Sequence, residues 1–129
     1  MSEPMNPKDV VLRFLDLMEK RELKAAQGLL APGFDMVFPG PVRPASLEQL
    51  VIWAQNRYRY VRKTFEQVDS MELGSGRSVV YCSGTLDGEW TDGSLFQGIR
   101  FIDRFELQGL KIVHQSVWND MALHLPGQP

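Results

Sequence analysis

The chain has 129 residues and a formal net charge of −2, so we expect one domain, residues 1–129, with a buried core. A charge so near zero argues against the basic surface that nucleic-acid binding needs, and the apolar stretches are too short to cross a bilayer. The single cysteine, Cys82, excludes an internal disulfide framework. The N-terminus shows no signal-peptide pattern, and we therefore expect a cytoplasmic protein.

Two helices and a short strand are predicted first. Asn6 can cap a helix that has Pro7 at its first position. Its apolar residues form one stripe, made of Val11, Phe14, Leu15 and Met18. A second, shorter helix is expected over residues 23–30, ending near Pro32, and a strand over residues 34–38.

The longest helix is predicted after a proline-rich loop. Ser46, followed three residues later by Gln49, is a capping box that opens it. A stripe at helical spacing extends it to residue 61 and consists of Leu47, Leu50, Val51, Ala54, Tyr58 and Val61.

From Phe65 onward the hydrophobic period changes to two, which indicates strands. Strands are predicted over residues 65–73, 77–90, 95–107 and 111–123. Helices followed by a long antiparallel meander are typical of an α+β domain. A sheet of this length must coil, and helices against its concave side leave a cone with a hollow centre.

One acid lies in an apolar pattern. Asp92-Gly93 predicts a two-residue hairpin turn, which places Trp90 opposite Leu95 and Cys82 opposite Asp103. Asp103 then shares a face with apolar residues of both strands. A carboxylate there must find a partner, hold its proton or face a cavity. Tyr58 and Asn119 are the partners we expect if its role is structural.

The register of the last strand leaves two alternatives. A three-residue loop before Lys111 places Gln115 opposite Asp103 and directs His114 and Trp118 to the outer face, which we prefer. A two-residue turn exchanges the faces and brings His114 opposite Asp103, a pair suited to proton transfer. In either register Cys82 beside a carboxylate is expected to be a poor nucleophile.

The order of elements and two long motifs resemble the nuclear transport factor 2-like superfamily, in particular its SnoaL-like and ketosteroid isomerase-like branch. The first motif includes Leu29-Leu30-Ala31-Pro32-Gly33-Phe34. The second comprises residues 98–105 with residues 111–120. The resemblance implies a cystatin-like conical barrel, in which a curved antiparallel sheet wraps around N-terminal helices.

The resemblance also bears on chemistry. Asp103 is similar in context to the strand aspartate of ketosteroid isomerases, but Phe14 and Phe38 occupy the positions of the tyrosine and the general base. Steroid isomerisation is therefore disfavoured, because a missing base forfeits roughly 10²–10⁴-fold in rate. A SnoaL-like cyclase, which uses such an acid to move a proton, demands fewer groups.

We therefore expect a pocket for a small apolar or aromatic ligand, with Asp103 as the catalytic residue and no cofactor or metal. The residues expected to bind substrate are Tyr58, Gln115, Asn119, Trp53, Phe101, Phe14 and Phe38. The activity would be that of an isomerase, cyclase or lyase. The alternative is a non-catalytic ligand-binding or dimeric interaction domain, since an outer sheet face bearing Tyr81 and Trp118 would suit a homodimer.

Overall fold

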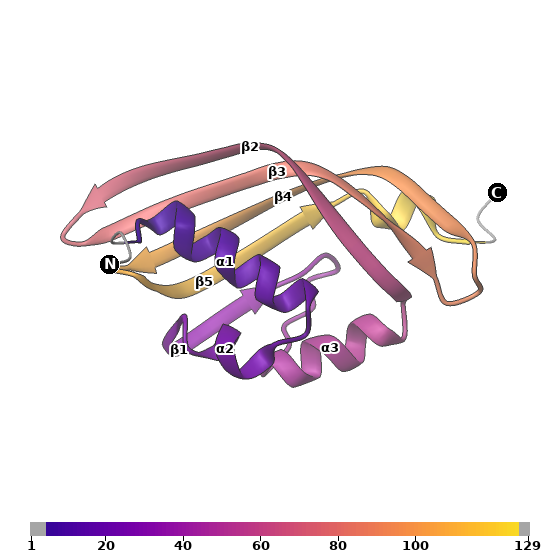
Figure 1. Ribbon diagram of the computed structural model, residues 1–129, viewed down its shortest axis with the longest axis horizontal. Coiled ribbons are helices and arrows are strands. Elements are labelled where there is room, and N and C mark those ends of the chain that lie inside the picture. Colours follow the sequence, from indigo (N-terminus) through magenta and orange to yellow (C-terminus); the bar gives the residue numbers. More distant parts are fainter. Residues whose placement is uncertain (1–4, 127–129) are drawn as a thin grey trace.

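A computed structural model describes residues 5–126 as helices packed against the concave face of one curved sheet (Figure 1). The helices are α1 (Pro7–Glu19), α2 (Leu23–Gln27) and α3 (Leu47–Gln55). The strands are β1 (Leu30–Val37), β2 (Tyr58–Gly74), β3 (Arg77–Trp90), β4 (Leu95–Gln108) and β5 (Lys111–Asn119), and a short 3-10 helix, η1 (Met121–His124), follows. Within these residues no helix combines the length and the apolar character that crossing a membrane would require.

The sheet has the order β1-β5-β4-β3-β2. This confirms the predicted α+β class with its antiparallel meander, but two features differ from a conical antiparallel barrel. β1 runs parallel to β5, and β1 and β2 are the two edges of an open sheet. The sheet therefore forms a cone-like trough, closed over by α1 and α3 on its concave side (Figure 1).

The first helix forms as its sequence predicts. The Asn6 side chain accepts a hydrogen bond from the Asp9 backbone at 2.9 Å, and the Asp9 carboxylate accepts one from the Asn6 backbone at 3.2 Å. This capping box satisfies amide groups that a helix start leaves free. The predicted stripe is buried in the core that α1 shares with the sheet.

The second helix is shorter than predicted, and β1 begins earlier. Leu30 already pairs with Ile112 of β5, so the chain leaves the helix after Gln27. Gly33, with φ +78°, lies where the register of β1 shifts, and this irregularity lets a Pro-Gly pair occur within a strand.

The third helix ends at Gln55 and does not reach residue 61, so Tyr58 and Val61 belong to β2. Both residues fit helical spacing, but the segment that they begin also alternates and is rich in aromatic and β-branched residues. Pairing with β3, where Tyr58 meets Trp90, decides between the two periods. The prediction of one long helix was wrong.

The predicted β3–β4 register is confirmed at Asp103 but not at the hairpin tip. Cys82 pairs with Asp103, whereas near the hairpin tip Leu95 pairs with Glu89 and not with Trp90. A register shift after Leu86 causes this difference, and Leu95 consequently lies exposed.

The last strand differs from both predicted registers. A two-residue turn places Gln108 opposite Lys111. Val113 is then an extra residue in β5, so the side chains after it face the opposite way from the one that this turn alone would give. Asp103 therefore pairs with Val117, and neither Gln115 nor His114 lies opposite it. The predicted faces still hold for Gln115, which is buried, and for Trp118, which is exposed. β5 ends at Asn119 and not at residue 123. The Asn119 side chain accepts a hydrogen bond from the Met121 backbone N–H, and the chain continues as η1.

Two glycines of β3 allow β2 to cross closely over it. A Cβ atom at Gly84 would overlap the carbonyl oxygen of Thr64, and one at Gly88 would overlap that of Tyr60. The register of β2 shifts beside both positions. This close crossing brings the first half of β2, including Lys63, over the concave face.

Candidate functional site

The concave face contains two adjacent chambers of about 110 Å³ and about 90 Å³. They share a wall made of Phe38, Tyr58, Val61 and Lys63. Each is smaller than the ~150 Å³ cavity that accepts a benzene molecule in an engineered protein, and together they exceed it. The space suits a small ring compound.

All the residues predicted for the site line one chamber or the other. The first chamber contains Phe14, Phe38, Tyr58 and Gln115, and the second contains Trp53, Phe101, Asp103 and Asn119 together with Phe38 and Tyr58. Aromatic rings form much of the lining, with the Phe38 and Trp53 centroids 5.6 Å apart. Their roles toward a ligand stay predictions.

Asp103 is fully buried and bonds to a residue that the sequence analysis did not select. Its Oδ2 accepts a hydrogen bond from Lys63 Nζ at 2.5 Å, while Lys63 remains 21% exposed. The Lys63 ammonium also lies 4.9 Å from the centre of the Phe101 ring. The expected partners, Tyr58 and Asn119, do not bond to Asp103, so that prediction was wrong.

Three buried polar atoms of the lining have no hydrogen-bond partner among residues 5–126. They are Asp103 Oδ1, Gln115 Oε1 and Arg57 Nε. Buried polar atoms in proteins are nearly always hydrogen-bonded, because an unpaired one loses the bond it made to water. Such atoms, which line the two adjacent chambers, are available to a polar ligand.

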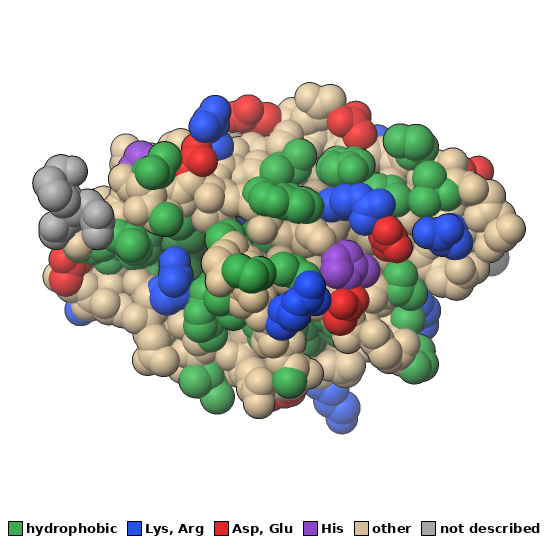
Figure 2. Space-filling model, turned by 180° about the vertical axis from the view of Figure 1, so that it is seen from behind, with side chains coloured by type: hydrophobic (Ala, Val, Ile, Leu, Met, Phe, Trp, Pro, Cys, Tyr) green, Lys and Arg blue, Asp and Glu red, His purple; other side chains and the backbone are tan. Residues whose placement is uncertain are grey.

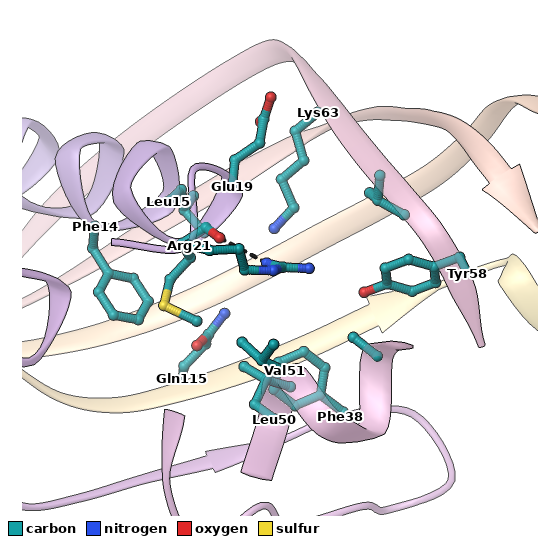
Figure 3. A pocket seen from close by; sticks show the side chains of 13 residues that line it. Phe14, Leu15, Glu19, Arg21, Phe38, Leu50, Val51, Tyr58, Lys63 and Gln115 are labelled. Carbon is teal, nitrogen blue, oxygen red and sulfur yellow. Dashed lines mark hydrogen bonds between the residues drawn. The ribbon is translucent and has the colours of Figure 1, made fainter. Parts of the chain in front are cut away.

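Tyr58 lies among positive charges. Burial raises the pKa of its hydroxyl, and the charges of Arg21, Lys63 and Arg57 oppose this rise. Figure 3 shows its hydroxyl pointing into the first chamber, toward the Arg21 guanidinium. Although Tyr58 begins a strand and not the end of a helix, it still presents its hydroxyl to the cavity.

Cys82 is buried behind this wall. Burial, followed by the nearby charge of Asp103, raises the pKa of its thiol to about 12. The thiolate is the nucleophilic form, so this cysteine is unreactive at neutral pH. The prediction of a poor nucleophile is confirmed.

The three basic residues of the cavity lining were not selected from the sequence, namely Arg21, Arg57 and Lys63. Lys63 was detectable, because Val61, Lys63 and Phe65 alternate on one face once β2 is taken to begin at Tyr58. Arg21 follows the end of α1, and no pattern in the sequence marks it as a cavity residue.

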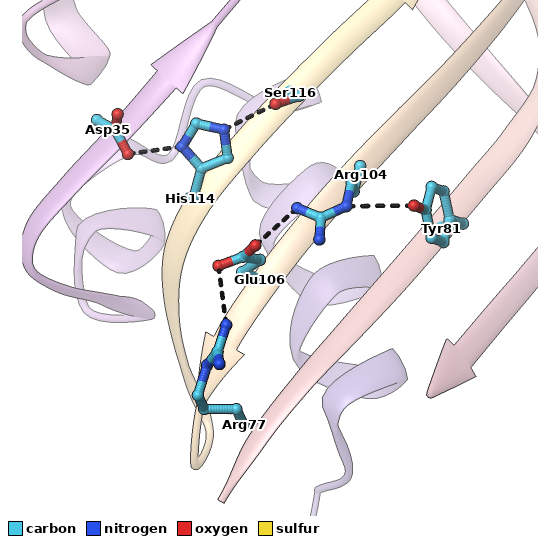
Figure 4. A network of polar contacts seen from close by, with 7 residues as sticks. All are labelled: Asp35, Arg77, Tyr81, Arg104, Glu106, His114 and Ser116. Atoms are coloured by element: carbon cyan, nitrogen blue, oxygen red, sulfur yellow. Dashed lines mark hydrogen bonds and ion pairs between the residues drawn. The ribbon is translucent and has the colours of Figure 1, made fainter. Parts of the chain in front are cut away.

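The outer face of the sheet carries a separate polar network (Figure 4). His114 Nδ1 lies 2.6 Å from Asp35 Oδ1, and its Nε2 lies 2.7 Å from Ser116 Oγ. These contacts join β1 to β5. His114 is therefore turned away from Asp103, and the alternative with an acid and imidazole pair in the cone was wrong.

Comparisons with models of protein families and with curated proteins find no match. Solved structures do resemble the chain. An NTF2-like protein of unknown function from Burkholderia pseudomallei has a TM-score of 0.73 at 15% identity, covering 96% of this chain and 100% of that one. TerC, co-crystallized with polyporic acid, has a TM-score of 0.72 at 14% identity, covering 92% and 95%.

A third similar structure is a protein from Jannaschia sp. CCS1, provisionally named a SnoaL-like polyketide cyclase. Its TM-score is 0.61 at 12% identity, with 100% of both chains covered. At such identities the likeness establishes the fold and leaves the activity open. The chain has the nuclear transport factor 2-like fold that its sequence resemblance predicted.

Proposed function

We propose that this chain is a small-molecule-binding domain of the SnoaL-like kind, whose cavity takes an apolar carbonyl compound and whose Asp103 exchanges a proton with it. The observation that supports this most is that the two oxygens of the Asp103 carboxylate have different surroundings. Lys63 holds Oδ2, and Oδ1 has no partner among the described residues. A fixed carboxylate with one free oxygen is arranged to accept a proton or a hydrogen bond from a ligand.

The surroundings fit the same role. Phe38 and Phe101 supply apolar contact area, and Gln115 adds a second unpartnered acceptor. A site that is mostly apolar with a few convergent polar groups is the usual form of a small-molecule pocket. The Lys63 ammonium, close to Asp103, could also stabilise negative charge that develops on the carbonyl oxygen as the α-proton leaves.

The proposal can be tested with phenylacetone, an enolisable aromatic ketone. Exchange of its α-protons in deuterated water is followed by proton NMR with and without the protein. We expect wild type to accelerate the exchange and Asp103→Asn to lower that acceleration by about 10²-fold or more, as loss of a general base does. Asp16→Asn is the matched control, since Asp16 also binds a lysine, Lys20, but at an exposed site.

A second variant guards against misfolding. Asp103→Asn leaves Lys63 without its partner, whereas Asp103→Asn combined with Lys63→Met removes both charges. The double variant should also lack exchange activity while melting close to wild type. Undiminished exchange in either variant would refute the catalytic role of Asp103.

The rival function, non-catalytic binding, is favoured by one observation. Asp103 has no exposed surface and already has a charged partner, and such a pair can serve structure alone. Under this alternative phenylacetone raises the melting temperature of wild type and of the double variant equally, and no exchange is seen.

We also propose that a second copy covers the outer sheet face. Hydrophobic side chains lie there among charges of both signs (Figure 2), and Tyr81, Ile102 and Trp118 are exposed by 36%, 38% and 53%. Arg104 and Glu106 lie on the same face, so a two-fold axis can bring opposite charges together. Sedimentation should show a dimer that Trp118→Lys converts to a monomer; a monomeric wild type at micromolar concentration would contradict this.

A further inference from the structure

Arg21 has an unusual backbone conformation. α1 ends at Glu19, Lys20 caps it, and Arg21 follows with φ +59°. This is the left-handed position after a helix, where glycine is the usual residue because a side chain is strained there. Strained residues that persist in a fold often belong to functional sites.

The Arg21 side chain reaches into the first chamber. Its Nη1 donates a hydrogen bond to the Met18 carbonyl at 2.7 Å, which fixes the guanidinium near the end of α1. Figure 3 shows this group between Lys63 and Tyr58. One of the five N–H donors of an arginine is thereby used, and the others are available to a ligand.

The charges of the lining do not cancel. Lys63 and Asp103 neutralise each other, but Arg21 and Arg57 have no carboxylate within 4.0 Å in the described part of the chain. The remaining acid, Glu19, points away from the Arg21 guanidinium (Figure 3), and both residues are exposed overall. The cavity is thus apolar in area and positive in charge.

Arg57 contributes to the second chamber. Its guanidinium carbon lies 4.7 Å from the centre of the Trp53 ring, within the range of a cation–π contact with this aromatic wall. Its buried Nε has no partner among residues 5–126. The planar donor fork of a guanidinium matches the geometry of a carboxylate.

We propose that, among carbonyl compounds, the cavity selects aromatic ones that also carry a carboxylate, with the ring between the apolar walls and the carboxylate bound by the Arg21 guanidinium. This rests on the proposed function, because it assigns the ligand class of that same pocket. Arginine suits the task, since its fork of donors can bind both carboxylate oxygens and it stays charged at all relevant pH values. Lys63 is committed to Asp103 and plays no such role.

Benzoate and benzamide test this selection, because they share ring and shape and differ in charge. Calorimetric titration at low ionic strength should show benzoate binding wild type about tenfold more tightly than benzamide, consistent with a charge-assisted hydrogen bond. Arg21→Gln should remove this preference and leave benzamide binding unchanged. Arg13→Gln, a change at an exposed arginine of α1 that lines neither chamber, is the control and should keep the preference.

Arg21→Gly provides a second variant whose folding is not in doubt, because glycine suits the backbone at this position. It too should lose the preference for benzoate. The proposal would be overturned if wild type bound benzoate and benzamide equally, or if the Arg21→Gln and Arg13→Gln variants lost the preference for benzoate to the same extent. Either result would leave a small-molecule pocket in place. Failure of both probes to bind would instead refute the pocket itself, and this proposal with it.

Discussion

Asp103 and Arg104 are neighbours on β4, but their side chains meet different surroundings. Asp103 is fully buried on the concave face and bonds to Lys63 at 2.5 Å. Arg104 lies on the outer face, where it bonds to Glu106 at 2.8 Å and both side chains are 28% exposed. One residue step along a strand thus separates a buried ion pair from a partly solvated one.

The difference shows which charges the fold depends on. On the concave face the Asp103 carboxylate has lost its water and depends on the partly exposed Lys63 ammonium. Outside, water and neighbouring groups such as the Tyr81 hydroxyl can replace a missing partner. The concave face therefore holds its polar groups in fixed positions, as a binding site needs, and the outer face does not.

The largest expected effect comes from Lys63→Met. Asp103 would be left buried without a charged partner, and we expect a loss of about 3–5 kcal/mol in the free energy of unfolding. Urea denaturation measures this. Arg104→Met, the matched change on the outer face, should cost less than about 1 kcal/mol.

A double variant, Lys63→Met with Asp103→Leu, sharpens the same comparison. It removes both buried charges, so much of the lost stability should return. A Lys63→Met variant as stable as Arg104→Met would show that the two faces do not differ in the way described.

Gly84→Ala tests the close crossing that positions Lys63. The added methyl group would overlap the Thr64 carbonyl and push β2 away from β3. We expect a destabilisation of about 1–3 kcal/mol, as is usual for overpacking. Gly93→Ala, at a turn glycine with open space around it but φ +91°, separates backbone strain from steric overlap. An unchanged melting temperature for Gly84→Ala would contradict the crossing.

Arg21→Gly is expected to stabilise the fold. A non-glycine residue in the left-handed region costs roughly 1 kcal/mol, and glycine removes this cost. The melting temperature should therefore rise slightly while binding of benzoate is lost. A fall in melting temperature would mean that the hydrogen bond from Arg21 to Met18 outweighs the backbone strain.

Glu106→Gln probes the outer face through pH and should have the smallest effect. The hydrogen bond from Arg104 lowers the pKa of Glu106 from its usual 4.5. A carboxyl group whose pKa is lower in the folded state stabilises the fold at pH values above its unfolded-state pKa. This contribution is lost as the pH falls through the folded-state pKa. At neutral pH the free energy of unfolding of wild type should exceed that of the variant by less than about 1 kcal/mol, and this difference should begin to shrink as the pH falls below about 4.5. A gap that persists in acid would contradict the assignment.

The sequence predicts well where local chemistry decides the structure. The capping box at Asn6 predicted α1. The pairing of Cys82 with Asp103 was also predicted, although the register at the hairpin tip differs by one residue and the shift after Leu86 restores it. The placement of Asp103 on a buried face followed from that register. Phe101 could be selected because alternation along a strand directs it to the same side as Asp103, and Phe14 because it lies on the apolar stripe of α1.

The sequence predicts poorly where pairing between distant strands decides the secondary structure or the register. Tyr58 fits both helical and strand periods, and only β3, which it meets 32 positions later at Trp90, settles the choice. That error removed Lys63 from consideration and so hid the partner of Asp103. The extra residue at Val113 shifted the last register in a way that turn length alone could not reveal.

The most direct test of the account is a crystal structure of the protein with phenol, a small aromatic ring with one hydroxyl group. We predict the ring between Phe38 and Phe101, the phenol oxygen about 2.5–3.0 Å from Asp103 Oδ1, and Lys63 still bound to Oδ2. A structure in which Lys63 extends into solvent, or in which phenol binds only outside the two chambers, would contradict the central claim that Lys63 holds the buried Asp103 ready for a ligand.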